Sequence, residues 1–431
     1  MAKRKYSGKS QTPASPAKPQ ETVQAAKAAE AEEKLVPEGR GGRLSLSQQG
    51  DIVLYSGKRL PIIDNARGVI MLGVLIIGFG FIQKYSSPFF YHHSFYPGVG
   101  IRDMLTPILL LTLAFTMELS FQKRAAAKGV KAAVSHGVKR GFTYIVMGLV
   151  LDEFLGFVHL KESVAMGAAL WIPAWNIFQS IGAGIVTASL CLRLKTKHKL
   201  LIIVALLAIP YIVQLIYPET VDYWNINAAE SNEARRWGGI FSFFSFGALL
   251  IGYNVLTKLA FSNFKRYLIV YAAIVALAVV CIIATPTFSE LQYMFNAQNA
   301  LTADGNLTYM TFLKEVLHNP LIINFPTISF GYIAFGTALG ATILLIMVLL
   351  NYLYDRDIPL ISSLGKNSLL FFILFSVTAK PMSSMVYANW FNFDGTLNPP
   401  LYVPIVYTAC MTALFCGIAY ILDRKKWYFK L

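Results

Sequence analysis

Charged residues and cysteines are scarce in this sequence. Only 14% of the 431 residues are charged, and only four are cysteines. All four cysteines fall inside apolar segments, where a free cysteine behaves as a small hydrophobic residue. The sequence therefore predicts neither a disulfide framework nor a reactive thiol site.

The common ligand-binding motifs are missing as well. There is no Walker-type nucleotide loop, no dinucleotide fingerprint and no metal-ligand spacing, so we expect no metal site. The net charge of +15 is of the kind that attracts nucleic acid, but the basic residues stand in short loops and tails beside apolar runs. Such placement is typical of membrane orientation signals, and we expect no nucleic-acid partner.

Long apolar runs are abundant. Hydrophobic residues make up 55% of the chain, which indicates a polytopic integral membrane protein embedded in a lipid bilayer. Because a helix needs about 20 apolar residues to cross the hydrocarbon core, the sequence predicts an all-α fold with about ten transmembrane helices. The windows are 66–84, 103–121, 142–160, 174–192, 199–216, 237–257, 267–285, 328–352, 363–388 and 401–422.

The N-terminal segment differs from the rest. Residues 1–57 contain almost no large apolar side chains, so they are predicted to form a disordered basic tail. The tail lacks the apolar core of a cleavable signal peptide, and we expect the first hydrophobic segment to remain in the mature protein. Residues 58–431 are predicted to form the transmembrane domain.

The basic residues predict the orientation of the chain. If the tail is cytoplasmic, the loops on its side carry most of the lysines and arginines, including Lys123, Arg124 and Lys128. The positive-inside rule then places both termini in the cytoplasm and His93 on the outer side. We expect the protein in the cell membrane.

Polar and helix-breaking residues are concentrated from His92 to Pro107, between the first predicted span and the start of the second. A charged side chain inside a span costs about 2.5–3.5 kcal/mol on insertion scales, so Asp103 needs a partner, water or a function. Pro107 cannot donate a hydrogen bond to the carbonyl of Asp103, and we expect the helix to kink there. His92 and His93 either lie in a hydrated outer loop or act chemically.

A second polar group precedes the first span. Asp64 is expected to cap the start of the helix, and Arg67, three residues on, to pair with it. The pattern Asp64-x-x-Arg67-Gly68, followed by the stretch from His93 to Pro107, resembles the transmembrane acyltransferase family that includes heparan-alpha-glucosaminide N-acetyltransferase. The family spacing is matched by His93, Gly98, Asp103 and Pro107, with Tyr96 in place of a tryptophan, and the family's C-terminal Gly-x-Asn-Ser signature by Gly365, Lys366, Asn367 and Ser368.

The resemblance implies an enzyme that moves an acyl group, usually acetyl, from cytoplasmic acyl-CoA to a glycan or glycolipid acceptor on the other face. His93 would be the catalytic imidazole, either as a base toward the acceptor or as a nucleophile toward the thioester. Asp103 would orient His93 or bind the acceptor, unless it is only a solvated carboxylate at the helix start. Four cations are expected to bind the coenzyme, although orientation alone also explains the three in the loop: Arg67, Lys123, Arg124 and Lys128.

The sequence departs from the family at two positions. Where the family has an asparagine late in the first span that assists the histidine, this chain has Gly78, and Phe375 stands where a late histidine is expected. Either the acceptor differs, or Asn176, Gln179 or Tyr96 supplies the hydrogen bond, or acyl transfer has been lost.

A non-enzymatic carrier of a solute or lipid, with a gate around His93 and Asp103, is the alternative function. For the enzyme, the partners would be acetyl-CoA or another acyl-CoA and an extracytoplasmic glycan or glycolipid. The sequence leaves open whether the protein is a monomer or a homo-oligomer.

Overall fold

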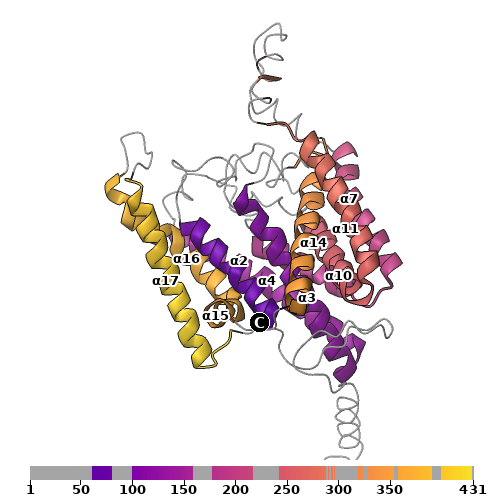
Figure 1. Ribbon diagram of the computed structural model, residues 1–431, viewed down its shortest axis with the longest axis horizontal. Coiled ribbons are helices and arrows are strands. Elements are labelled where there is room, and N and C mark those ends of the chain that lie inside the picture. The colour runs from indigo at the N-terminus through magenta and orange to yellow at the C-terminus, as the bar shows by residue number, and fades with distance from the viewer. Residues whose placement is uncertain are drawn as a thin grey trace, which may run out of the picture.

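Helices form every regular element of the described chain (Figure 1). The computed structural model describes residues 61–79, 100–158, 177–216, 242–287, 290, 293, 294, 296, 319–323, 329–353, 358–390 and 399–429. The predicted all-α fold is confirmed for these residues, and the predicted tail, 1–57, lies outside them. The elements are α2 (Pro61–Phe79), α3 (Ile101–Lys128), α4 (Val130–Val158), α6 (Ile177–Cys191), α7 (Thr196–Ile216), α10 (Ser242–Ser262), α11 (Phe264–Ala284), α14 (Phe330–Leu353), α15 (Pro359–Lys366), α16 (Ser368–Tyr387), the short 3-10 helix η7 (Ala388–Trp390) and α17 (Tyr402–Arg424).

Several of these helices can cross a membrane. Six described helices are long and apolar enough: α2, α3, α10, α11, α14 and α17, and the bent pair of α15 and α16 would add a seventh. Each of the ten predicted windows overlaps at least one helix, and the ninth, 363–388, overlaps both α15 and α16. The membrane class is therefore confirmed, whereas the number of ten spans stays a prediction.

Apolar side chains cover the outside of α11. Ile269 is 71% exposed and Ile283 is 79% exposed, although both lie in a helix made almost wholly of apolar residues. An apolar surface of this kind is stable in lipid and costly in water. The face of α11 that carries these residues is thus a lipid-facing surface.

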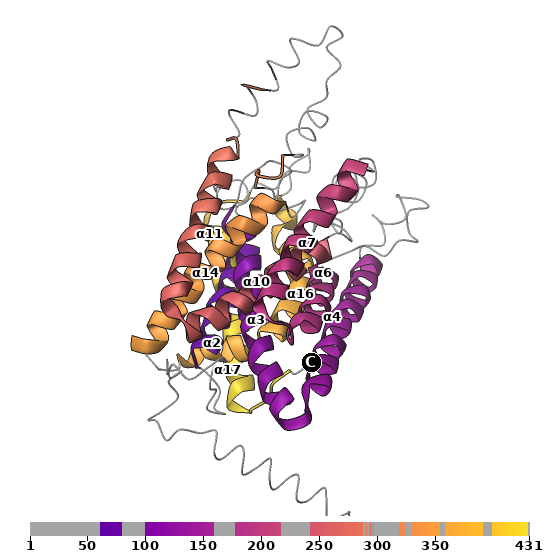
Figure 2. The same cartoon turned by 90° about the vertical axis from the view of Figure 1, so that its right-hand side faces the viewer.

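A tight turn joins α3 and α4. Gly129 has a φ of 83°, in the left-handed region that glycine adopts without strain, and it ends α3. Its amide donates to the carbonyl of Ala125 over 3.0 Å. In Figure 2 this turn lies at the same end of the molecule as the last residues of α17, the end that the basic residues predict to be cytoplasmic.

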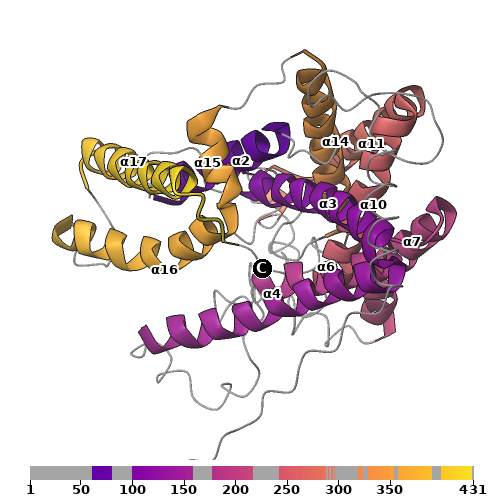
Figure 3. The same ribbon diagram turned by 90° about the horizontal axis from the view of Figure 1, so that it is seen from below.

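The buried apolar side chains form two clusters, and the view from below shows the helices around them (Figure 3). The larger apolar cluster draws on α3, α6, α10, α11 and α14. The smaller cluster joins α2, α16 and α17 and is rich in aromatic side chains, including Phe79, Phe371, Tyr407 and Phe415. The two segments of family resemblance, at α2 and at the α15–α16 junction, lie beside this smaller cluster.

The expected kink at Pro107 does not interrupt α3, which runs from Ile101 through Pro107 to Lys128. The pyrrolidine ring packs against α14, because a Cβ added to Gly336 would lie 3.0 Å from Cγ of Pro107. The carbonyl of Gly336 also accepts a hydrogen bond of 2.6 Å from the hydroxyl of Tyr253. Gly336 thus gives α3 and α10 a common packing position on α14.

Candidate functional site

A very close helix crossing joins two of the segments that carry the family resemblance. A Cβ added to Gly68 of α2 would lie 1.9 Å from the carbonyl oxygen of Ile361, and one added to Gly365 of α15 would lie 1.8 Å from that of Asp64. Only hydrogen fits at either position. The Asp64-x-x-Arg67-Gly68 motif is therefore in direct backbone contact with the residues that precede Asn367.

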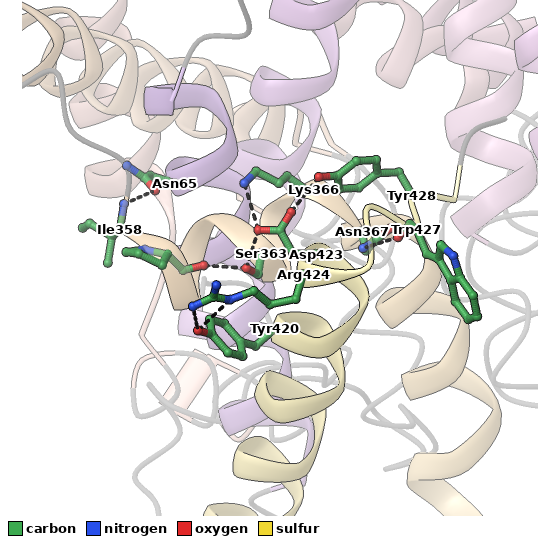
Figure 4. Close-up of polar contacts among 11 residues, drawn as sticks. Asn65, Ile358, Ser363, Lys366, Asn367, Tyr420, Asp423, Arg424, Trp427 and Tyr428 are labelled. Carbon is green, nitrogen blue, oxygen red and sulfur yellow. Dashed lines mark hydrogen bonds and ion pairs between the residues drawn. The ribbon is translucent and has the colours of Figure 1, made fainter.

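Polar side chains secure this crossing. The side-chain oxygen of Asn65 accepts a hydrogen bond of 3.2 Å from the amide of Ile358, just before α15 (Figure 4). Asp64 is only 4% exposed and lies in the first turn of α2, which begins at Pro61. The prediction that Asp64 caps the helix is wrong, because the helix starts three residues earlier at a proline, the residue favoured at the first helical position.

Asn367 holds the break between α15 and α16, where the chain bends by 76°. Its amide nitrogen donates to the carbonyl of Trp427 over 3.2 Å, and its oxygen accepts from the amide of Phe429 over 3.0 Å. The side chain of Asn367 thus donates and accepts one hydrogen bond each, as a backbone peptide group would. It holds the residues after α17 against the break between α15 and α16.

Asp423 supports the same junction from α17 (Figure 4). Its carboxylate accepts from the hydroxyl of Ser363 over 2.8 Å and from the ammonium of Lys366 over 3.0 Å. The hydroxyl of Tyr428 donates to its other oxygen over 2.8 Å. Both α15 and the residues after α17 are thus fixed to one carboxylate.

Arg67 points from α2 toward α3. Its guanidinium donates to the hydroxyl of Thr116 over 2.8 Å. This hydrogen bond places the guanidinium beside α3, and coenzyme binding by Arg67 stays a prediction.

The two departures from the family pattern touch each other. A Cβ added to Gly78 would lie 2.1 Å from Cζ of Phe375, so the ring of Phe375 occupies the space that a side chain at position 78 would need. Phe79 packs edge-on against the same ring, with centroids 5.1 Å apart. An apolar contact between α2 and α16 therefore stands where the family places two polar side chains.

A buried polar network links α3, α7 and α10. One oxygen of Glu118 accepts from the amide of Gln122 over 2.9 Å, and the other accepts from the amide of Asn254 over 2.5 Å. The oxygen of Asn254 accepts from the ammonium of Lys199 over 2.7 Å. Glu118, Asn254 and Lys199 are 8%, 2% and 5% exposed, so an anion and a cation are joined inside the bundle through one amide.

The predicted coenzyme-binding loop forms the end of α3. Lys123 and Lys128 are exposed and Arg124 is half-buried, so their charges reach solvent at the predicted cytoplasmic end. His136 follows in the basic first part of α4, before the apolar part that begins near residue 142. Burial, with added repulsion from Arg124, Arg140 and Lys139, lowers the pKa of His136 below its ordinary value.

Other predicted site residues lie partly or wholly beyond the described chain. His92, His93, Tyr96 and Asn176 fall outside it, and Asp103 lies in the first turn of α3 with a side chain that is not described. Gln179 is buried in α6 and engaged in an interaction. Among the described residues, no group of three or more His, Cys, Asp or Glu side chains could hold a metal ion.

Sequence reasoning missed Lys199, Asn254 and Asp423 as site-forming residues. Lys199 is one of the basic residues that the positive-inside rule explains by orientation alone, and Asp423 belongs to no motif in the sequence. Asn254 offered the clearest signal, because a polar amide inside an otherwise apolar span needs a partner. A comparison of the chain with protein-family models and with curated proteins found no match.

Proposed function

We propose that this protein is a membrane-embedded acyltransferase. It moves an acyl group, with acetyl as the favoured one, from cytoplasmic acyl-CoA to a glycan or glycolipid on the opposite face. The observation that carries the proposal is the close crossing of α2 and α15 at Gly68 and Gly365. A Cβ added to either glycine would lie 1.8–1.9 Å from a carbonyl oxygen of the other helix. Two motifs that resemble one family, and that are far apart in the sequence, meet there as one backbone unit.

The transfer balances as an exchange of one bond. The acceptor hydroxyl or amine gives its proton to the imidazole of His93, and its oxygen or nitrogen bonds to the thioester carbonyl carbon. The carbon–sulfur bond breaks, and the leaving thiolate takes the proton to give the free coenzyme thiol. In the nucleophilic variant the imidazole is acylated first and the acceptor then displaces it.

The apolar contact between Gly78 and Phe375 supports an acceptor with an apolar portion. Neither position supplies a hydrogen bond, and the ring of Phe375 keeps the outer part of α2 apolar. An acceptor with a hydrocarbon portion would gain from such a surface, whereas a free sugar would not. A glycolipid is therefore the favoured acceptor.

A carrier is the second candidate, and the bend of 76° between α15 and α16 favours it. Carriers commonly build substrate sites from broken helices near the membrane centre. The break in this chain is closed by Asn367, Asp423 and the residues after α17, which ties its moving parts to one another. This restraint makes a gate at the break less favourable than a fixed site.

The test uses liposomes loaded with radiolabelled acetyl-CoA and an amphipathic sugar acceptor outside. A positioned general base contributes about 10²–10⁴-fold to a rate, so His93→Ala should reduce labelling of the acceptor on that scale. His92→Ala, the matched control, should lose little activity.

Full activity of His93→Ala would remove the proposed mechanism. Escape of unmodified labelled solute from wild-type liposomes, without label on the acceptor, would identify the carrier instead.

A further inference from the structure

The layer around Lys199 contains one buried cation, one buried anion and a second, half-buried cation. Lys199 and the half-buried Lys258 are close enough for their charges to interact, and Glu118 is the one carboxylate whose charge acts on Lys199 among the described residues. Both oxygens of Glu118 are already occupied by the amides of Gln122 and Asn254. The carboxylate therefore does not contact the ammonium of Lys199 directly.

The ammonium of Lys199 makes fewer hydrogen bonds within the described residues than it has N–H donors. Among the described residues its ammonium makes one hydrogen bond, to Asn254, and the side chain is 5% exposed. An ammonium carries three N–H donors, so two are unused where water is scarce. A buried donor without an acceptor is destabilising, and a bound anion would supply the acceptor.

More buried donors without partners among the described residues lie on α10, α6 and α4. Thr257 stands one turn beyond Asn254 on α10, is 3% exposed, and its hydroxyl has no partner among the described residues. The same holds for the hydroxyl of Ser189, which faces Gly137 on α4, and for Nε of Arg140, one turn further along α4.

We infer that this layer binds a phosphate group, held by the ammonium of Lys199 with the hydroxyl of Thr257 as a further donor. A phosphate oxygen accepts several hydrogen bonds and carries the charge that the layer lacks, and lysine binds phosphate as a point charge. The basic residues Arg193, Lys195 and Lys197, which precede Lys199, lead into the site from the predicted cytoplasmic end. Long-range attraction by such charges raises the rate of anion capture.

The phosphate belongs either to a soluble coenzyme or to a phospholipid head group. The inference rests on the proposed function only in naming acyl-CoA as the favoured source. Phosphate binding itself needs neither an acceptor nor His93. Failure of the transfer reaction and failure of the phosphate site are therefore distinguishable.

The test titrates the full chain, in nanodiscs of phosphatidylcholine, with inorganic pyrophosphate by calorimetry. Lys199→Gln should weaken binding roughly tenfold or more, because a charge-assisted hydrogen bond is lost. Lys265→Gln, exposed in the first turn of α11, should change binding little. Glu118→Gln removes the counter-charge and should tighten binding, a gain that a purely structural network would not produce.

A second variant guards against misfolding. Loss of Lys199 alone leaves Glu118 charged and buried, whereas Lys199→Gln combined with Glu118→Gln keeps the layer neutral and should fold without binding pyrophosphate. Pyrophosphate binding of equal strength in the wild type, Lys199→Gln and the double variant would overturn the inference, and so would the absence of any Lys199-dependent binding of pyrophosphate or phospholipid.

A parallel arm adds phosphatidylglycerol to the nanodiscs and measures the lipid retained by the protein. Competition of this lipid with pyrophosphate only in proteins that keep Lys199 supports the shared phosphate site. If retention of the lipid depends on Lys199 while pyrophosphate never binds, the soluble coenzyme is excluded as the source.

Discussion

Asn254 joins two charges that do not touch each other. Its oxygen faces the ammonium of Lys199 and its nitrogen faces the carboxylate of Glu118, so the amide can be oriented only one way. A side chain that hydrogen-bonds to a buried cation and a buried anion together offsets part of the desolvation cost of both. The stability of this part of the bundle therefore depends on a residue with no charge.

Replacing Asn254 with leucine should destabilise the protein by about 1–3 kcal/mol, because two buried charged groups lose a hydrogen bond. Thermal unfolding in nanodiscs would measure the loss. Thr257→Val, one turn away and equally buried, is the control, and it should be neutral or slightly stabilising because its hydroxyl lacks a partner among the described residues. An unchanged melting temperature for Asn254→Leu would show that water replaces the amide.

His136 reports on the charges at the cytoplasmic end of α3. Its lowered pKa means that the folded protein binds fewer protons than the unfolded chain, so stability falls as the pH drops through about 6.5, the ordinary value. Arg124→Gln removes one of the repelling charges and should raise the pKa of His136, although burial, the larger cause, remains. NMR titration of the histidine would measure the change.

Lys123→Gln is the matched control for this titration, because Lys123 is not among the charges that act on His136. An equal shift in both variants would mean that the general positive field, and not Arg124, sets the pKa.

At the scale of helices, the contact between α2 and α16 is governed by one ring. Gly78 provides the space and Phe375 fills it, while Phe79 packs edge-on against the same ring. The helix surfaces interlock at this point, so a change on one side requires a change on the other.

Gly78→Ala should destabilise the protein by about 1–3 kcal/mol, because the added methyl group overlaps the ring of Phe375. Phe375→Ala should cost about 3–5 kcal/mol through the cavity it leaves. In the Phe375→Ala background the cost of Gly78→Ala should vanish, and a double-mutant cycle from unfolding measurements would show this coupling. Additive effects would mean that the helices separate instead of clashing.

This contact also bears on the substitution of Gly78 by asparagine, which the family resemblance suggests. Gly78→Asn would restore the family's amide, but its Cβ alone already meets Phe375. The substitution should therefore overfill the helix contact unless Phe375 is made smaller in the same variant.

The sequence predicts the location of the helices better than it predicts their breaks, their first residues and the contacts between them. Composition alone located helices in all ten apolar windows, but it did not reveal the break at Asn367, because a 76° bend changes no residue type. The start of α2 at Pro61 follows the preference of proline for the first helical position, and Asp64 is therefore not the capping residue. The pairing of Lys199, Asn254 and Glu118 depends on how three helices pack, which no local pattern contains.

At the scale of the whole molecule, the orientation in the membrane remains a prediction from basic residues. The turn at Gly129 and the end of α17 lie at one end of the molecule, as that prediction requires (Figure 2). Gly129 has no atom within 4 Å of an added Cβ, so an insertion there should not disturb packing.

Reporters inserted at Gly129 or fused after Leu431 should read cytoplasmic, and one inserted between residues 300 and 301 should read external, because lysine and arginine concentrate on the first side. Accessibility to a membrane-impermeant label would measure this. A cytoplasmic reading for the insertion at residue 300 would refute the arrangement of ten spans.

The crossing of α2 and α15 has a consequence for how the protein is made. Asn65 and its partner Ile358 are separated by 293 residues, so α2 enters the membrane long before the helix that contacts it exists. At about 5–20 residues per second, the delay is roughly 15–60 s. During that interval Asp64, which is 4% exposed in the finished protein, lacks the backbone that later encloses it. The rate of translation therefore limits how soon the crossing of α2 and α15 can form, and the folding rate of α2 itself does not.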